Sequence, residues 1–175
     1  MTQKQIAESI LKRYVELHAV EGYKLDYDWV KNHFKRKCKA TEFGLIGAAI
    51  EDLISENLVE INYDDDSSAL MLTKSGFQRI YKVDAEKAIT KMTIDMMTLF
   101  RNQRSMPNHV LILTWLEQML AHDFNPAELA LLPDAIKQLT ELGYIKKEDK
   151  NNFCIILTQQ GYEAMQQPVN FKKAS

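Results

Sequence analysis

The chain has 175 residues, of which 46% are hydrophobic and 26% charged, a balance typical of folded globular proteins. Its formal net charge is −2, which does not by itself indicate a polyanionic partner. Charged residues interrupt the N-terminal segment, and no uncharged apolar run approaches the roughly 18 residues of a membrane span. We therefore expect a soluble, cytoplasmic protein without a membrane partner, whose two cysteines, Cys38 and Cys154, are free thiols.

The first half of the chain predicts three helical regions, two strands and a closing helix. In chain order these are helices over Gln3–Ala19, Asp26–Lys37 and Thr41–Asn57, strands over Leu58–Tyr63 and Ala69–Leu72, and a helix over Lys74–Lys82. Gly47 interrupts the third region, which indicates a short helix, a junction and a longer helix. Asn57 suits a left-handed helix end, and Thr73 suits the N-cap of the closing helix.

The second half predicts the same succession of elements. These are helices over Ala85–Gln103, Asn108–His122 and Asn125–Gly143, strands over Tyr144–Lys147 and Phe153–Leu157, and a helix over Gln159–Gln166. Asn125 and Pro126 suit the start of the third region, and Pro133 interrupts it. No Gly or Pro occurs from Phe77 to Arg104. One helix could therefore run from the first half into the second, unless Asp84 is the N-cap of a separate helix.

A shift of 86 positions brings the two halves into register. The matched residues include Leu25 with Leu111, Trp29 with Trp115, Glu42 with Glu128, Leu45 with Leu131, Ala49 with Ala135 and Leu53 with Leu139. After the loss of one residue, Leu72-Thr73-x-x-Gly76-Phe77 matches Leu157-Thr158-x-x-Gly161-Tyr162. The sequence thus predicts two tandem domains, 1–83 and 84–167, followed by a flexible tail over 168–175.

The two tryptophans and several methionines occupy positions typical of a core. Trp29 and Trp115 lie on the apolar sides of the second helix of each half, and a buried tryptophan removes a large area from water. Met92, Met96 and Met97 follow a helical spacing. We expect all five side chains to pack inside the domains.

The order of elements resembles the winged-helix family. Its bacterial regulators often show a helix ending L-x-x-x-G-[LY]-[IV], then a hairpin and L-T-x-x-G, and here Leu139–Ile145 is followed by Leu157–Gly161. In the first half Leu53–Val59 precedes Leu72–Gly76, with Asn57 in place of the usual glycine. The resemblance implies a mainly α fold with small β-hairpins (α+β), as a tandem repeat of two winged-helix-like domains. Winged helices bind DNA, RNA or proteins, so the resemblance leaves the function open.

A basic cluster is the feature that favours double-stranded DNA as the partner. It consists of Lys31, His33, Lys35, Arg36, Lys37 and Lys39 at the end of the second helix, where a helix-turn-helix protein can contact phosphate. In the second half, Lys137 of the recognition helix and Lys146, Lys147 and Lys150 of the wing are the candidate contacts. The first hypothesis is therefore a DNA-binding transcriptional regulator, for which a homodimer is one arrangement.

Acidic residues favour the alternative, a protein–protein adaptor built from tandem winged helices. The expected recognition helix of the first half, Ala48–Glu56, contains three carboxylates and no basic side chain. Asp64, Asp65 and Asp66 make its wing acidic as well. Phosphates would repel both surfaces, so this hypothesis stays open beside the first.

No catalytic or cofactor-binding motif occurs in the sequence. The four histidines are scattered, and neither a metal-binding His or Cys pair nor a glycine-rich phosphate loop is present. An EF-hand loop starting at Asp64 would need Gly and Glu where Ala69 and Ser75 stand. We expect a protein that is not an enzyme and needs no cofactor or metal.

Overall fold

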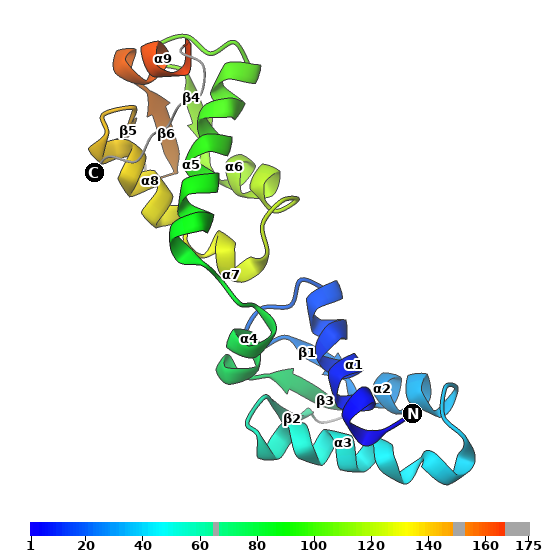
Figure 1. The fold of residues 1–175 in the computed structure, drawn as a ribbon. Helices are drawn as coiled ribbons and strands as arrows, with labels where there is room; N and C mark the ends of the chain where they lie inside the picture. Colours follow the sequence, from blue (N-terminus) through cyan, green and yellow to red (C-terminus); the bar gives the residue numbers. More distant parts are fainter. Residues whose placement is uncertain (65–66, 149–152, 167–175) are drawn as a thin grey trace. The chain divides into compact units, whose positions relative to one another are not determined.

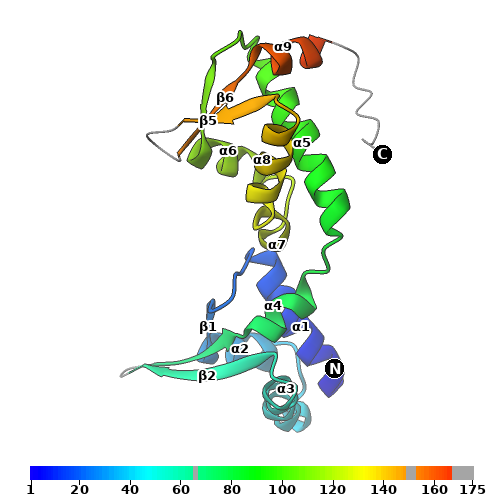
Figure 2. The same ribbon diagram turned by 90° about the vertical axis from the view of Figure 1, so that its left-hand side faces the viewer.

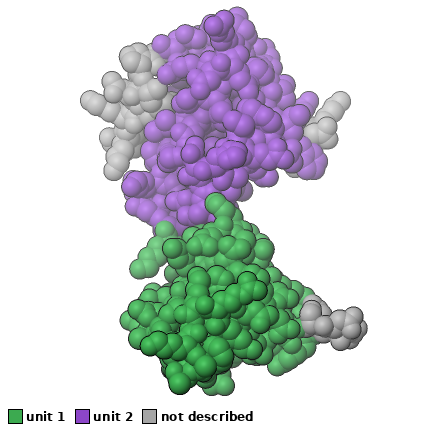
Figure 3. All heavy atoms as spheres, turned by 90° about the vertical axis from the view of Figure 1, so that its right-hand side faces the viewer, with its two compact units in different colours: residues 1–82 green, residues 83–175 purple. Residues whose placement is uncertain are grey.

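The computed structural model describes residues 1–64, 67–148 and 153–166. The chain divides into two compact units, residues 1–82 and 83–175, which Figure 3 colours separately. Each unit combines helices with a small antiparallel three-stranded sheet, so the protein is of mixed α and β structure. No helix in the described part of the chain is both long and apolar enough to cross a membrane. The expected tail, 168–175, lies outside the described residues.

Unit 1 begins with a helix and ends with a helix (Figure 1). Its elements are α1 (Gln3–Glu16), β1 (Lys24–Asp26), α2 (Tyr27–Lys35), the 3-10 helix η1 (Ala40–Glu42), α3 (Gly44–Ser55), β2 (Val59–Asp64), β3 (Ser67–Leu72) and α4 (Lys74–Ile80). The strand order is β1-β3-β2, with all neighbours antiparallel. Figure 2 shows the β2–β3 hairpin projecting past the helices of this unit.

The core of unit 1 lies between α1, α3 and the sheet. Helix α1 contacts both α3 and α4, and α2 packs on β3. Ile6, Ile10 and Tyr14 of α1 are fully buried, as are Leu70 and Leu72 of the central strand β3. This apolar spacing explains why α1 forms, because it places one side of the helix on the core.

Unit 2 has elements in the same order. They are α5 (Ala85–Asn102), β4 (Val110–Ile112), α6 (Leu113–Leu120), α7 (Pro126–Leu129), α8 (Leu132–Glu141), β5 (Ile145–Lys147), β6 (Cys154–Leu157) and α9 (Gln159–Gln166). The strand order is β4-β6-β5. Helix α5 contacts α6, α7, α8 and α9. The prediction that Met92, Met96 and Met97 belong to the core is confirmed, because each is buried.

The predicted helix ends at Asn57 and Gly143 are confirmed. Asn57 has a φ of 55° and Gly143 a φ of 70°, both in the left-handed region that ends a helix. The predicted N-caps at Thr73 and Asn125 are also confirmed, because each side chain accepts a backbone N–H of the following turn. Of the two alternatives at the join, the structure has the capped one, with Asp84 accepting the N–H of Lys87. Helix α4 ends at Ile80 and α5 starts at Ala85, so no continuous helix crosses the join.

Other predictions about elements are wrong, and one strand is missed. Gly47 does not interrupt the third helical region, because α3 runs through it and the junction falls at Phe43. The helix expected over Asn108–His122 starts only at Leu113, because Val110–Ile112 forms β4 on the distant strand β6. The equivalent strand Lys24–Asp26 was not predicted, because three residues carry no readable periodicity. The first helix ends at Glu16 rather than Ala19, since His18 adopts a φ of 49°.

Tyr14 is the largest fully buried side chain of unit 1, and its hydroxyl donates to the carbonyl of Leu70 at 2.7 Å. Burial raises the pKa of Tyr14, so the hydroxyl keeps its proton as a donor. We expect Tyr14→Phe to lower the free energy of unfolding by about 1 kcal/mol, the usual contribution of one hydrogen bond. Urea denaturation measures this loss. An unchanged midpoint would show that the bond contributes nothing.

Candidate nucleic-acid interface

Helix α2 packs one side on the core and has basic residues on the two sides next to it. Asp26 caps the helix by accepting the N–H of Trp29, and Val30 and Phe34 are buried against the core. Residues four apart share one side of a helix. The basic cluster is therefore divided, with Lys31 and Lys35 on one flank and His33 and Lys37 on the other.

The first flank faces the start of α3. Lys31 and Lys35 line one groove of about 280 Å³ together with Phe43, Gly44, Ile46, Gly47 and Ile50, and we call this the α2–α3 groove. The Lys31 ammonium lies 4.1 Å from the centre of the Tyr27 ring. Phe43 keeps 39% of its surface exposed, and nothing lies within 4 Å of the positions that a Cβ on Gly44 or Gly47 would take. The start of α3 is thus open to an approaching ligand.

The second flank faces α1. His33 and Lys37 share a pocket of about 280 Å³ with Trp29, Phe34 and residues of α1, namely Ser9, Ile10, Lys12, Arg13 and Glu16. We call this the α1–α2 pocket. Sequence reasoning missed Lys12 and Arg13 because they lie on another helix. Only the packing of α1 beside α2 adds them to the basic cluster.

The prediction that Trp29 anchors the core is wrong. Its side chain remains 37% exposed, its ring stacks on His33 with centroids 4.7 Å apart, and the Arg13 guanidinium lies 5.1 Å from its centre. Helix α2 is short, and Val30 and Phe34 already fill its buried side, which leaves Trp29 at the margin. Trp115 of unit 2, by contrast, is partly buried and packs against the core.

The basic residues at the end of α2 lack ion pairs. Lys35, Arg36, Lys37 and Lys39 are exposed, and among the described residues none lies within 4.0 Å of a carboxylate. Other lysines of the protein do form ion pairs, such as Lys91 with Asp95 at 2.8 Å. The positive charge of this segment is therefore not locally neutralised.

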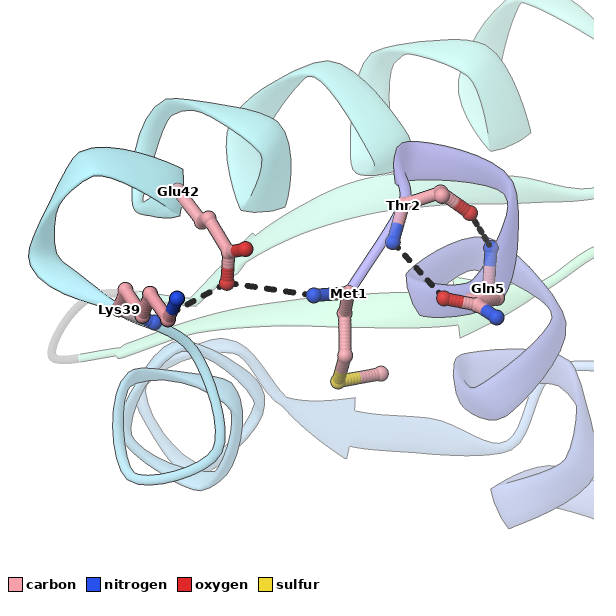
Figure 4. A network of polar contacts seen from close by, with 5 residues as sticks. All are labelled: Met1, Thr2, Gln5, Lys39 and Glu42. Carbon is pink, nitrogen blue, oxygen red and sulfur yellow. Dashed lines mark hydrogen bonds and ion pairs between the residues drawn. The ribbon is translucent and has the colours of Figure 1, made fainter.

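Glu42 holds the turn between α2 and α3 (Figure 4). Its carboxylate accepts the backbone N–H of Lys39 at 3.0 Å and pairs with the N-terminal ammonium of Met1 at 3.2 Å. Thr2 and Gln5 hydrogen-bond each other at the start of α1. Both contacts are made by Oε2 of Glu42, and they tie the turn before α3 to the start of α1.

These contacts lower the pKa of Glu42, chiefly through the Lys39 N–H and then through the N-terminal ammonium. A carboxyl whose pKa is lower in the folded state stabilises the fold above its unfolded pKa, and this contribution is lost as pH falls through the folded pKa. We expect carbon-detected NMR titration to give Glu42 a lower pKa in the folded chain than in the chain unfolded in urea. The same pKa in the folded and unfolded chain would refute this expectation.

The C-terminal half of α3 is acidic, as the sequence predicts. Glu51, Asp52 and Glu56 are exposed, and the Asp52 carboxylate accepts a hydrogen bond from Gln3 at 2.6 Å. Of the acidic wing, Asp64 ends β2, whereas Asp65 and Asp66 lie outside the described residues. A polyanion would therefore meet favourable charge only at the N-terminal half of α3.

Among the described residues, the candidate basic residues of unit 2 do not form a comparable cluster. Lys137 of α8 lies 3.9 Å from Glu141 and lines a groove with Glu86, Asp134 and Glu141. Lys146 and Lys147 are exposed neighbours on β5, and Lys150 lies outside the described residues. Carboxylates thus offset Lys137, and only Lys146 and Lys147 remain as adjacent basic side chains.

Charge in the α1–α2 pocket also affects His33. Partial burial is the largest cause of its lowered pKa, and the positive charges of Lys37, Arg13 and Arg36 add to the effect.

Within residues 1–64, 67–148 and 153–166, no three His, Cys, Asp or Glu side chains are grouped to hold a metal ion. No protein-family model matches this chain, and no curated protein matches it in sequence.

Proposed function

We propose that this chain is a non-enzymatic DNA-binding protein of the transcription-regulator type, and that unit 1 contacts double-stranded DNA beside the α2–α3 groove. The observation that carries the proposal is the unpaired positive charge at the end of α2. Exposed lysines without carboxylate partners favour the binding of a polyanion, because its phosphate groups supply the negative partners. The open start of α3 lies on the same groove as Lys31 and Lys35.

The order of elements supports a winged-helix assignment for both units. Helix, short strand, two helical segments, hairpin and closing helix follow each other in unit 1 and again in unit 2. Winged-helix proteins place the helix before the hairpin on DNA, and this helix is α3 in unit 1. The assignment accounts for the position of the basic cluster, directly before that helix.

Paired backbone features support a duplication as the origin of the two units. His18 and Arg104, 86 positions apart, have φ values of 49° and 51°. The Thr73 hydroxyl donates to the carbonyl of Asn57 at 2.6 Å, and the Thr158 hydroxyl donates to the carbonyl of Gly143 at the same distance. Equivalent constraints at equivalent positions favour a common ancestor over chance.

The mode of contact follows from the charges on α3. Its N-terminal half has Gly44 and Gly47 on the surface and no carboxylate in the first turn, so its own side chains neither block nor repel an approaching phosphate. Its acidic C-terminal half would repel the duplex. We therefore expect contacts to the phosphate backbone to supply most of the affinity of unit 1.

Titration of a fluorescently labelled 20-base-pair duplex, followed by anisotropy, tests the proposal. We expect saturable binding at about 50 mM salt that weakens steeply toward about 200 mM, because neutralised phosphates release counterions. Absence of binding at the lower salt concentration would contradict the proposal.

The edge of the second sheet favours a second function, that of a protein–protein adaptor. In unit 1 the edge strand β1 exposes Lys24 and Asp26, and charged side chains protect an edge from pairing. In unit 2 the edge strand β4 instead exposes two apolar side chains. Val110 keeps 43% of its surface exposed and Ile112 keeps 54%. An apolar edge of this kind favours contact with another protein chain. A second copy of the protein would give the homodimer that the first hypothesis allows.

A further inference from the structure

The α1–α2 pocket has an aromatic wall. Trp29 keeps more than a third of its surface exposed while its ring already stacks on His33. Ile10 and Phe34, both buried, complete the apolar part of the lining. The exposed part of the indole offers a surface for another aromatic ring, beside the His33 ring and the Arg13 guanidinium that already lie against it.

The rest of the lining is positively charged. Lys12, Arg13 and Lys37 supply three positive charges, and Glu16 supplies the one carboxylate. Glu16 is shared, since it lies 4.0 Å from the Lys12 ammonium and 3.2 Å from the Arg13 guanidinium. Lys37 has no carboxylate partner among the described residues, so positive charge exceeds negative charge in the lining.

Arg13 has donor capacity beyond its ion pair with Glu16. Its Nε is buried and, within the described structure, has no hydrogen-bond partner. The side chain keeps 37% of its surface exposed, so its guanidinium N–H groups can donate to a phosphate oxygen, which is a strong acceptor. Burial lowers the pKa of His33 most, and the positive charges of Lys37 and Arg13 lower it further.

Unit 2 indicates that the fold does not need these cations. At the positions 86 residues later, Trp115 retains the indole, whereas Leu99 replaces Arg13, Met119 replaces His33 and Asp123 replaces Lys37. Unit 2 nevertheless forms the same sequence of helices and strands. The cations of unit 1 are therefore more simply explained by a ligand than by stability.

We propose that the α1–α2 pocket binds a nucleoside phosphate, with the base stacked against Trp29 and the phosphate held by Lys12, Arg13 and Lys37. This ligand site lies on the opposite flank of α2 from the α2–α3 groove and requires no duplex. The nucleoside phosphate comes either from a free mononucleotide or from one nucleotide of a single strand. A volume of about 280 Å³ suits one such unit rather than a paired helix.

The test uses the full chain with Trp115→Phe, which leaves Trp29 as the only tryptophan. The probes are AMP, adenosine and a single-stranded ten-nucleotide thymidine oligomer. We expect Trp29 fluorescence to change saturably with AMP or with the oligomer, and adenosine to bind at least tenfold more weakly than AMP. Saturation by AMP assigns a free nucleotide, and saturation by the oligomer alone assigns a single strand.

Charge-reversal variants decide whether the signal comes from the pocket. Lys12→Glu with Lys37→Glu is expected to weaken binding at least tenfold, because both ammonium groups leave the phosphate site. Lys4→Glu is the matched control on α1, since Lys4 is exposed and does not line the pocket. Circular dichroism confirms that the variants fold. No fluorescence change with either phosphate probe, or equal affinity in the charge-reversal variant, would overturn the proposal.

Discussion

Replacement of Gly76 by alanine is expected to lower the free energy of unfolding of unit 1 by about 3 kcal/mol. A Cβ at this position would lie 1.9 Å from the carbonyl oxygen of Leu58, and a backbone atom cannot turn aside as a side chain can. The hairpin and α4 would have to separate. Urea denaturation followed by Trp29 fluorescence in a Trp115→Phe background measures the loss.

Gly47→Ala is the matched control for this substitution. Gly47 lies inside α3, and nothing lies within 4 Å of the Cβ that alanine would add. Alanine there should stabilise the protein by about 0.5–1 kcal/mol, the usual helical preference over glycine. If Gly76→Ala proved as harmless as Gly47→Ala, the close contact with Leu58 would not exist in solution.

Gly161→Ala should reproduce the effect in unit 2. Its Cβ would lie 2.1 Å from the carbonyl oxygen of Tyr144, which is the same close approach. Trp115 fluorescence in a Trp29→Phe background follows this unit separately. Comparable losses at Gly76 and Gly161 would support the proposal that both units descend from one domain.

The combined substitution Lys31→Glu with Lys35→Glu is expected to weaken duplex binding at least tenfold and to flatten its salt dependence. Each lost phosphate contact should reduce the slope of log affinity against log salt by about one. Both side chains line the α2–α3 groove, and neither has a carboxylate partner among the described residues. Anisotropy titrations at several salt concentrations give both values.

The control variant is Lys4→Glu with Lys74→Glu. It makes the same change in net charge, on exposed residues of unit 1 outside the basic cluster. If the two double variants lost affinity equally, only the total charge of the protein would matter. The groove would then have no special part in binding. Unchanged affinity in both would contradict the proposed interface altogether.

Local signals made much of the fold predictable. Asn57 and Gly143 indicate the helix ends, because few residues other than Gly and Asn tolerate the left-handed region of φ. Thr73 and Asp84 indicate where helices can start, because their side chains accept hydrogen bonds from backbone N–H groups that lack helical partners. The strands β1 and β4 escaped prediction, since each is three residues long and exists only through pairing with a distant strand.

The candidate site was only partly predictable. The sequence shows the basic cluster as one run, but the turn of α2 sends Lys31 and Lys35 to one side and Lys37 to the other. Arg13 joins the second side only because α1 packs there. The exposure of Trp29 depends on how much of α2 the core accommodates, and periodicity does not reveal this.

The most direct test of the proposed function is a titration of the isotope-labelled full chain with the duplex, followed by amide resonances in NMR spectra. The duplex proposal predicts that the largest changes at low salt fall on the end of α2, the turn after it and the start of α3, including Lys35, Lys39 and Gly44. Changes confined to unit 2, or unchanged spectra at saturating duplex, would contradict it.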